Sequence, residues 1–383
     1  ALSIVLLITT ITAFILMPAD LLKSYSQSLV SVATFSSNIF FYLTSGYFST
    51  ASDEKPLLHT WSLAVEEQYY IFFPIMITMF WFIGKKRLIS LLTVLSVISL
   101  LCSEYMSKTG AIDANFYLIF SRAWELFFGS LIAFTSLHRL SMQRWQKEVI
   151  GIFGLSLIFY SIVFFDKQTP FPSFYTLVPV LGTCVVIIFS DCNTYVGRFL
   201  SNKLFVAIGL ISYSLYLWHQ PLFAFLRLKT IGEPHSMFFM GAITLTFALS
   251  FLSYKYVEKP FINKSLMPRN TIFKYSTVSI ALILSVGLSG HFFKGFENRF
   301  ENNIYTKTIK FSPKRKECHT KGSKYLKPDK ACRYFGHNIT WASFGDSHTV
   351  EPAFALAKML EHDEVVLLHL SFSGCPPALL FDS

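Results

Sequence analysis

The apolar residues of this chain fall into long continuous runs. Many of these runs approach the roughly 20 residues that a helix needs to cross the hydrocarbon core of a bilayer. Apolar residues make up 52% of the sequence and charged residues only 15%, against about 25% in an ordinary soluble domain. We therefore predict a polytopic α-helical membrane bundle over residues 1–293, with spans at Leu2–Met17, Tyr70–Ile83, Leu88–Cys102, Phe116–Leu137, Val149–Phe165, Thr176–Ser190, Leu204–Leu226, Met237–Tyr254 and Phe273–Phe293.

One moderately apolar segment, Ser28–Phe48, is rich in Ser, Thr and Asn. If it were a full span, every later loop would change sides and the basic loops would lie outside. We interpret it as an interfacial or re-entrant helix. The first span begins at Ala1 without a starting methionine, and we expect the sequence to be an internal piece of a longer protein.

The basic residues are distributed unevenly between the two sets of loops. One set carries 13 Lys and Arg residues and the other carries 6. The positive-inside rule places the first set in the cytoplasm, and the chain after Phe293 then lies outside. This topology accounts for the net charge of +10, so we expect no nucleic-acid partner. The cytoplasmic loops are Gly84–Arg87, His138–Lys147, Asp191–Lys203 and Lys255–Lys274; the external ones are Pro18–Tyr69, Ser103–Asn115, Asp166–Tyr175 and Arg227–His235.

The six cysteines divide in the same way. Three lie within or at the ends of spans, where thiols are usually inert packing residues: Cys102, Cys184 and Cys192. The other three lie in the polar tail, on the side where disulfides persist. We expect Cys318 and Cys332 to pair, whereas Cys375 is either free or paired with a cysteine outside this sequence.

The composition changes at Lys294, where Lys, Arg, Asn and Pro replace Phe and Leu. We predict an external linker over residues 294–338. Residues 339–383 then read as a strand, a helix at Val350–Leu360 and a buried strand at Val365–Phe372. This order is typical of the start of an α/β domain.

Ser347 falls in the turn between the first of these strands and the helix. Unpaired N–H groups and the positive end of the helix dipole gather at such a position. A serine there is suited to nucleophilic attack on a carbonyl, with the N–H groups stabilising the oxyanion. The alternative is that Ser347 only caps the helix.

The stretch "PLLHTWSLAVEEQYYIFFP" places polar residues at the mouth of a span. If it is helical from Thr60, then His59, Ser62, Glu66 and Tyr69 or Tyr70 share one face, which is suited to lining a polar cavity. Alternatively, Glu66 and Glu67 are carboxylates favoured by the helix dipole.

Two further spans contain ionisable residues, which usually face the interior of a bundle and often mark function. His219 is either a functional residue or a neutral histidine bonded to a backbone carbonyl. Arg122 and Glu125 form either a structural ion pair or a cationic site for the phosphates of an acyl donor.

Three of these stretches resemble motifs of the acyltransferase-3 family of membrane O-acyltransferases: "LLHTWSLAVEEQYYIFFP", "ISYSLYLWHQPLF" and "YVEKPF". The resemblance covers roughly residues 1–264. In the tail, "FGDSHTVEPAF" and "SFSGCPPAL" resemble the opening of a flavodoxin-like SGNH hydrolase domain that is fused to one subgroup of these enzymes. That subgroup O-acetylates bacterial surface polysaccharides, including lipopolysaccharide O-antigen and peptidoglycan.

The resemblance implies an acyltransferase of the bacterial inner membrane, with its C-terminal domain in the periplasm. Acetyl-CoA is the expected donor, a lipid-linked or lipopolysaccharide glycan the expected acceptor, and membrane lipids the surroundings; no bound cofactor or metal is expected. The expected catalytic residues are Ser347, His59 and Glu66, and the expected substrate-binding residues are Trp61, Ser62, Glu67, Gln68, Tyr213, His219 and Arg122.

The sequence departs from the family pattern in two places. It lacks the histidine and the Arg-x-x-Arg pair that the family carries early in the membrane domain, and the later SGNH elements. We therefore expect this piece to be inactive alone, and Asp346 is not assigned as a triad acid.

Two routes of transfer stay open. In one, Ser347 carries the acetyl group briefly; in the other, the membrane domain acetylates the acceptor directly and the tail only positions it. A proton-coupled transporter with an external sensor domain and an inactive scaffold are the alternatives from other classes.

Overall fold

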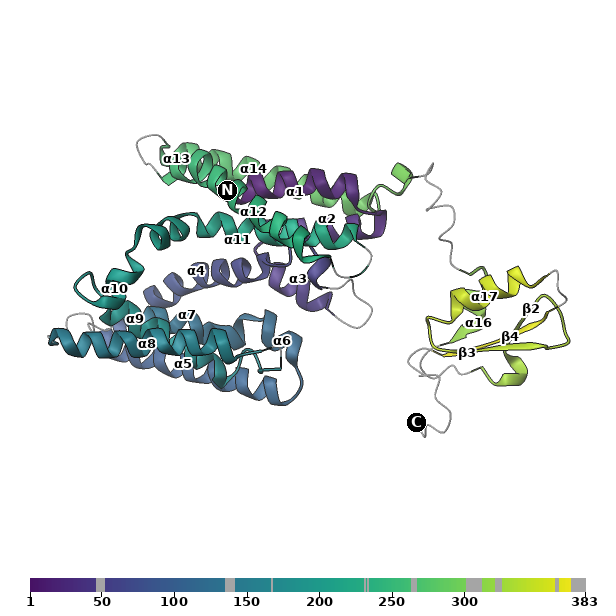
Figure 1. Cartoon of the computed structure of the whole chain (residues 1–383), viewed down its shortest axis with the longest axis horizontal. Helices are drawn as coiled ribbons and strands as arrows, with labels where there is room; N and C mark the ends of the chain where they lie inside the picture. Colours follow the sequence, from purple (N-terminus) through teal and green to yellow (C-terminus); the bar gives the residue numbers. More distant parts are fainter. Residues whose placement is uncertain are drawn as a thin grey trace. The chain divides into compact units, whose positions relative to one another are not determined.

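A computed structural model of the chain describes residues 1–45, 52–134, 142–166, 168–230, 232, 234–262, 267–300, 312–320, 326–361 and 365–372. The chain separates into two compact units, Ala1–Phe296 and Glu297–Ser383 (Figure 1). The first unit is helical in its described parts, and the second contains a small sheet.

The helices of the first unit follow the predicted apolar runs. Their bounds are α1 Leu2–Leu16, α2 Ala19–Ala33, α3 Ser37–Leu43, α4 Thr60–Phe80, α5 Lys85–Lys108, α6 Ile112–Tyr117, α7 Ile119–Phe134, α8 Arg144–Phe164, α9 Leu177–Phe189, α10 Tyr195–Leu200, α11 Lys203–Lys229, α12 Ser236–Ser253, α13 Lys259–Ile262 and α14 Arg269–Phe292. A π-helical turn, Tyr254–Glu258, joins α12 to α13. The largest difference from prediction is α4, which begins ten residues before the expected span.

Five helical segments of the described chain are long and apolar enough to cross a membrane: Lys85–Lys108, Ile112–Phe134, Arg144–Phe164, Ser236–Ile262 and Arg269–Phe292. The shorter segments Leu2–Leu16 and Phe174–Phe189 are also apolar. Helices α4 and α11 are long enough to cross a membrane, but their mean hydropathy is too low for a membrane span. Polar side chains inside a membrane must find partners within the protein. The polar residues of these two helices are therefore the candidates for a functional site.

The segment 28–48 is not a continuous helix as far as it is described, which supports the re-entrant interpretation. Helix α2 ends at Ala33, the chain turns at residues 34–36, and α3 begins at Ser37. Leu21, near the start of α2, lines the same pocket as Phe40 of α3. Residues from the start of α2 and from α3 therefore lie near one another.

Helix α14 packs closely against α2, and glycine permits the approach. A Cβ atom at Gly290 would lie 2.1 Å from the Ser26 hydroxyl, and one at Gly287 would lie 2.8 Å from the Ser26 carbonyl oxygen. Helix α2 is thus held against a long apolar helix.

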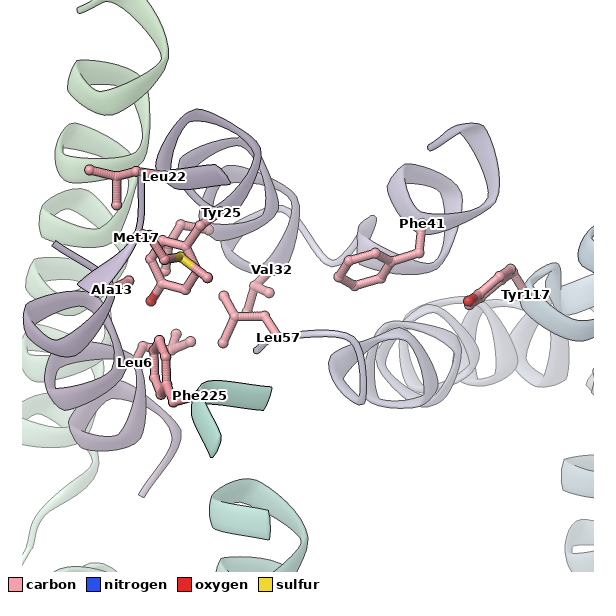
Figure 2. Packing of buried hydrophobic residues seen from close by; sticks show 11 residues of the cluster. Leu6, Ala13, Met17, Leu22, Tyr25, Val32, Phe41, Leu57, Tyr117 and Phe225 are labelled. Carbon is pink, nitrogen blue, oxygen red and sulfur yellow. The ribbon is translucent and has the colours of Figure 1, made fainter. Parts of the chain in front are cut away.

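A hydrophobic cluster joins the start of the chain to α2 and to α11 (Figure 2). Leu6 and Met17 of the α1 region pack with Tyr25 of α2, Leu57 from the segment before α4, and Phe225 of α11. Burial of such side chains contributes on the order of 2 kcal/mol each. This packing fixes the segment that leads into α4 beside α11.

The second unit is built around β4, Leu367–Phe372, which lies between strands on both sides. Strand β3, Trp341–Gly345, pairs with it in parallel, and helix α17, Val350–Met359, connects the two. The predicted strand–helix–strand order is therefore present. The expected SGNH identity of this unit stays a prediction.

The region that we predicted as a linker supplies two strands of this sheet. Strand β2, Cys332–Tyr334, pairs antiparallel with β4, and β1, His319–Thr320, pairs with it in parallel. The basic and polar composition of residues 294–338 gave no sign of strands this short. Cys318 and Cys332, the pair expected from the sequence, form a disulfide next to these strands. Cys375 lies outside the described residues.

His369 of β4 is buried in this unit, with 1% of its surface exposed. Its Nδ1 lies 3.0 Å from the Tyr334 hydroxyl, and its Nε2 is buried with no hydrogen-bond partner in the described chain. Burial, helped by the nearby His319 ring, lowers the pKa of His369 below its ordinary value. The fold of this unit therefore favours the neutral imidazole.

We expect the second unit to lose stability as the pH falls below about 6.5, the ordinary histidine pKa, because the unfolded chain then binds a proton that the folded His369 resists. Hydrogen exchange at the β4 amides, corrected for the intrinsic effect of pH, should rise between pH 7.5 and pH 5.5. The rise should vanish in His369→Gln and persist in His337→Gln, whose histidine is exposed. Equal pH dependence in both variants would contradict the assignment.

Candidate functional site

The polar stretch at residues 56–74 is helical from Thr60, as predicted, and His59 is the residue that precedes the first turn of α4. His59, Ser62 and Glu66 consequently lie on one face of this helix at intervals of three and four residues. The first turn of α4 contains no acidic residue. Because the dipole effect falls off within the first turn, it does not account for Glu66 and Glu67 in the second turn.

Helix α11 presents a matching series at intervals of three residues: Tyr213, Tyr216 and His219. The Tyr216 hydroxyl donates a hydrogen bond to the carbonyl oxygen of His59. The Ser62 hydroxyl lies 2.5 Å from the same tyrosine oxygen and therefore acts as its donor. We call His59, Ser62, Tyr216 and His219 the α4–α11 polar cluster.

His59 is the most enclosed member of the cluster, with 6% of its surface exposed. Neither ring nitrogen has a hydrogen bond of good geometry within the described chain, and the carbonyl of Pro56 is the polar group that lies within reach. Its ring packs edge-on against Tyr216 and His219, with centroid distances of 5.3 and 5.5 Å. A buried polar group left without a partner costs about 1–3 kcal/mol, so packing alone gives no reason for a histidine here.

His219 makes the backbone contact that we considered as its structural alternative. Its Nδ1 lies 2.6 Å from the carbonyl oxygen of Tyr216. The neighbouring Gln220 donates to the carbonyl of Lys55, which ties α11 to the segment before α4. One ring nitrogen of His219 is therefore structurally engaged, and the other is not bonded within the described chain.

A second group of polar residues lies further along the same two helices. Glu66, Glu67 and Tyr213 line a pocket of about 290 Å³, together with apolar residues of α1, α2 and α4. Glu258, in the π-helical turn, accepts a hydrogen bond from Ser214 of α11. Among the described residues, none of the three glutamates forms a salt bridge. Their carboxylates are therefore available to accept hydrogen bonds from hydroxyl groups.

Trp61 and Gln68, which we predicted as substrate-binding residues, lie on another face of α4. The Trp61 ring packs on Tyr117 at a centroid distance of 5.8 Å. The Gln68 side chain donates to the Phe35 carbonyl and to the Asn38 side chain, at 2.8 and 2.9 Å. These contacts show that both residues join α4 to α3 and α6, and their role in binding substrate stays a prediction.

Arg122 is also engaged within the protein. Its guanidinium group lies 3.3 Å from both carboxylate oxygens of Glu125 and donates to the Phe116 carbonyl. It is surrounded by three rings, at 4.6 Å from the centroid of Phe171, 4.9 Å from that of Trp61 and 5.0 Å from that of Phe116. Its side chain is only 8% exposed. These contacts fit the structural alternative for Arg122, whereas its Nη2 is buried without a hydrogen-bond partner in the described chain. The phosphate-binding alternative stays a prediction.

In the second unit, Ser347 lies in the turn between β3 and α17, as predicted. The carboxylate of Asp346 accepts a hydrogen bond from the His348 amide, at 2.9 Å, and so is occupied in shaping the turn. Ser347 is half-buried, and no hydrogen bond of its hydroxyl to the described residues is present. No described residue that could act as a base for Ser347 forms a hydrogen bond with its hydroxyl.

Sequence reasoning missed Tyr216, Ser214 and Glu258 as members of the site. A signal existed for two of them. Tyr216 stands three residues before His219, and therefore on the same helical face. Glu258 is the acidic residue of "YVEKPF", at the end of a predicted span. Their partners come from other helices, so the pairing itself was not visible in the sequence.

Residues 1–255 match the model of a protein family described as an acyltransferase domain, acyltransferase-3. Among curated proteins, the chain is 28% identical over 298 residues to a Staphylococcus aureus protein named "putative O-acetyltransferase", covering 74% of this chain and 49% of that protein. It is 27% identical over 271 residues to a Bacillus subtilis "putative peptidoglycan O-acetyltransferase", covering 67% and 42%.

A third relative, a "putative membrane-bound transacylase" of Komagataeibacter xylinus, is 30% identical over 214 residues, covering 56% of this chain and 53% of that protein. The chain thus spans about half of the length of these curated relatives. No solved structure matches it significantly. The family match covers about two thirds of the chain and contains nearly all of the polar site, so the chain belongs to the acyltransferase-3 family.

Proposed function

We propose that the protein containing this chain is a membrane O-acyltransferase that transfers an acetyl group to sugar hydroxyls of a bacterial surface polysaccharide, such as lipopolysaccharide O-antigen. The observation that carries the proposal is the α4–α11 polar cluster. The chain belongs to a family of acyltransferases. The cluster brings two histidines together, one just before α4 and one on α11. Among the described helices, α4 and α11 are the two that are long enough to cross a membrane but not apolar enough.

The chemistry of the cluster fits this reaction. Transfer of an acetyl group from a thioester to an alcohol needs a base for the hydroxyl proton and groups that stabilise the developing negative charge. A histidine is the residue best suited to take a proton at neutral pH. The carboxylates of Glu66 and Glu67 are suited to hold the other hydroxyls of a sugar. Acetyl-CoA, as the donor, would approach from the cytoplasm.

A second candidate acceptor is peptidoglycan. It is supported by the name of the Bacillus subtilis relative, which matches over 67% of this chain. The comparisons give no support to the transporter alternative.

The second unit has two possible parts in this reaction, and both are proposals. Ser347, in its strand-to-helix turn, is placed to carry the acetyl group as an ester before it reaches the glycan. Alternatively, the unit only binds the acceptor while the membrane unit performs the transfer. An SGNH-type domain in the periplasm, attached to a bundle in the inner membrane, accommodates both routes.

The proposal is tested most directly by expressing the full-length gene in a deletion strain. We expect NMR spectra of purified lipopolysaccharide or peptidoglycan to regain O-acetyl signals. The glycan that regains them identifies the acceptor, and recovery in neither glycan would refute the proposed function.

We expect His59→Ala and Glu66→Ala in the full-length protein each to lower glycan acetylation about 100-fold, the loss that a small displacement of groups within an active site can cause. The physical reason is that both residues face α11 within the site. The matched controls are His235→Asn, at an exposed position where asparagine also caps a helix, and Glu361→Gln, at an exposed position in the second unit. Wild-type acetylation in both site variants, at equal amounts of inserted protein, would refute this site.

The proposed topology places the second unit outside the cytoplasmic membrane. We expect a membrane-impermeant maleimide to label Cys318 and Cys332 in spheroplasts after reduction and not before, because they are joined in a disulfide. Cys192, an exposed thiol in a predicted cytoplasmic loop, is the internal control and should react only after lysis. Labelling of the tail cysteines only after lysis would reverse the topology.

We expect Ser347→Ala in the full-length protein to abolish transfer to the glycan without unfolding the second unit, since loss of a capping hydroxyl costs only about 1 kcal/mol. Ser343→Ala, on the neighbouring strand β3, should leave transfer unchanged. The isolated 383-residue chain should show no esterase activity that depends on Ser347, because no base for this serine is expected within it. Undiminished glycan acetylation in Ser347→Ala would show that the second unit only positions the acceptor.

A further inference from the structure

The two histidines of the α4–α11 polar cluster differ in their access to the surroundings. His59 is 6% exposed, whereas His219 is half-buried and lines a groove of about 390 Å³. The groove lies between α11 and α12, and its apolar walls include Phe223 and Phe247. His219 is therefore the less enclosed of the two histidines.

The hydrogen bond of His219 also determines which ring nitrogen is free to act as a base. A carbonyl oxygen only accepts hydrogen bonds, so Nδ1, at 2.6 Å from the Tyr216 carbonyl, must carry a proton. In the neutral imidazole, Nε2 then carries the lone pair. No described residue is bonded to Nε2, and this nitrogen is not among the buried unpartnered atoms. His219 therefore presents an unprotonated nitrogen that remains accessible.

His59 lacks both properties. Its two ring nitrogens are enclosed, and no carbonyl or carboxylate in the described chain fixes either tautomer by a hydrogen bond of good geometry. Its ring meets the His219 ring at 68°, and its own backbone carbonyl accepts the hydrogen bond from Tyr216. His59 is thus anchored to α11 next to His219.

We infer that His219 is the catalytic base of the proposed acetyl transfer and that His59 is a positioning residue, whose ring packs against the His219 ring and holds its orientation. The inference rests on the proposed function and assigns roles within its site. It exchanges the roles that the sequence suggested, where His59 was the catalytic residue and His219 a binding residue.

The step that follows is balanced. The oxygen of the acceptor hydroxyl attacks the carbonyl carbon of the acetyl thioester and forms the ester C–O bond, while the hydroxyl proton passes to Nε2 of His219. The C–S bond breaks as the tetrahedral intermediate collapses. The thiolate that leaves then takes the proton from Nε2, which regenerates the neutral imidazole and releases the thiol.

The rings that contact His219 include two titratable groups, His59 of α4 and Tyr216 of its own helix. The other ring against it is Phe223. No salt bridge in the described chain involves His219.

The test uses the full-length protein in proteoliposomes, with radiolabelled acetyl-CoA as donor and de-O-acetylated lipopolysaccharide or peptidoglycan as acceptor. His219→Ala should lower the transfer rate at least about 100-fold and remove the rise of the rate with pH. Added imidazole should restore a measurable part of the rate, because position 219 is less enclosed than position 59. His59→Phe, which keeps a ring at that site, should retain both the pH dependence and more activity than His59→Ala.

A second measurement does not depend on turnover or on a variant that folds. Diethyl pyrocarbonate should modify His219 of the wild-type protein at least about tenfold faster than His59, as read from peptide masses. Faster modification of His59, imidazole rescue of His59→Ala but not of His219→Ala, or an unchanged pH profile in His219→Ala would each overturn the inference. If the wild-type protein transfers acetyl to neither glycan, the proposed function itself fails and the inference fails with it.

Discussion

The structure of the membrane unit depends on one constraint, which is that polar side chains in a bilayer must be paired inside the protein. Ser62, Tyr216 and the His59 carbonyl satisfy one another in a short chain of hydrogen bonds between α4 and α11. This pairing joins the polar faces of two helices within an otherwise apolar bundle. Within the cluster, both ring nitrogens of His59 and Nε2 of His219 have no hydrogen-bond partner among the described residues.

The rest of the bundle holds this pair of helices in place. Helices α2 and α3 lie between α14 and the segment before α4, and Leu57 of that segment packs in the same cluster as Phe225 of α11 (Figure 2). On the other side of α4, Trp61 contacts the guanidinium group of Arg122, which is itself paired with Glu125. The charged and aromatic residues around Arg122 thus support the site.

The position of the site between helices also bears on how substrates reach it. Glu66, Glu67 and Tyr213 line one pocket, and His219 lines a separate groove between α11 and α12. The cluster of His59, Ser62 and Tyr216 lies between these two openings along the helices. An arrangement of this kind suits a reaction in which the donor and the acceptor approach one centre by different paths.

The sequence by itself determined the membrane class, the helical stretch from Thr60, the strand–helix order around Ser347 and the likeness to acyltransferases, because periodicity and motifs are local properties of a chain. It also singled out His59, Glu66 and His219 as candidates. It did not determine which polar residues meet, since Tyr216 and Ser62 are 154 residues apart and come together only through packing. For the same reason the sequence did not show that Trp61, Gln68 and Arg122 contact other parts of the bundle, and it gave no sign of the short strands β1 and β2. Exposure, tautomer and pairing are set by the neighbours that each side chain acquires in space, and only the tertiary structure decided them.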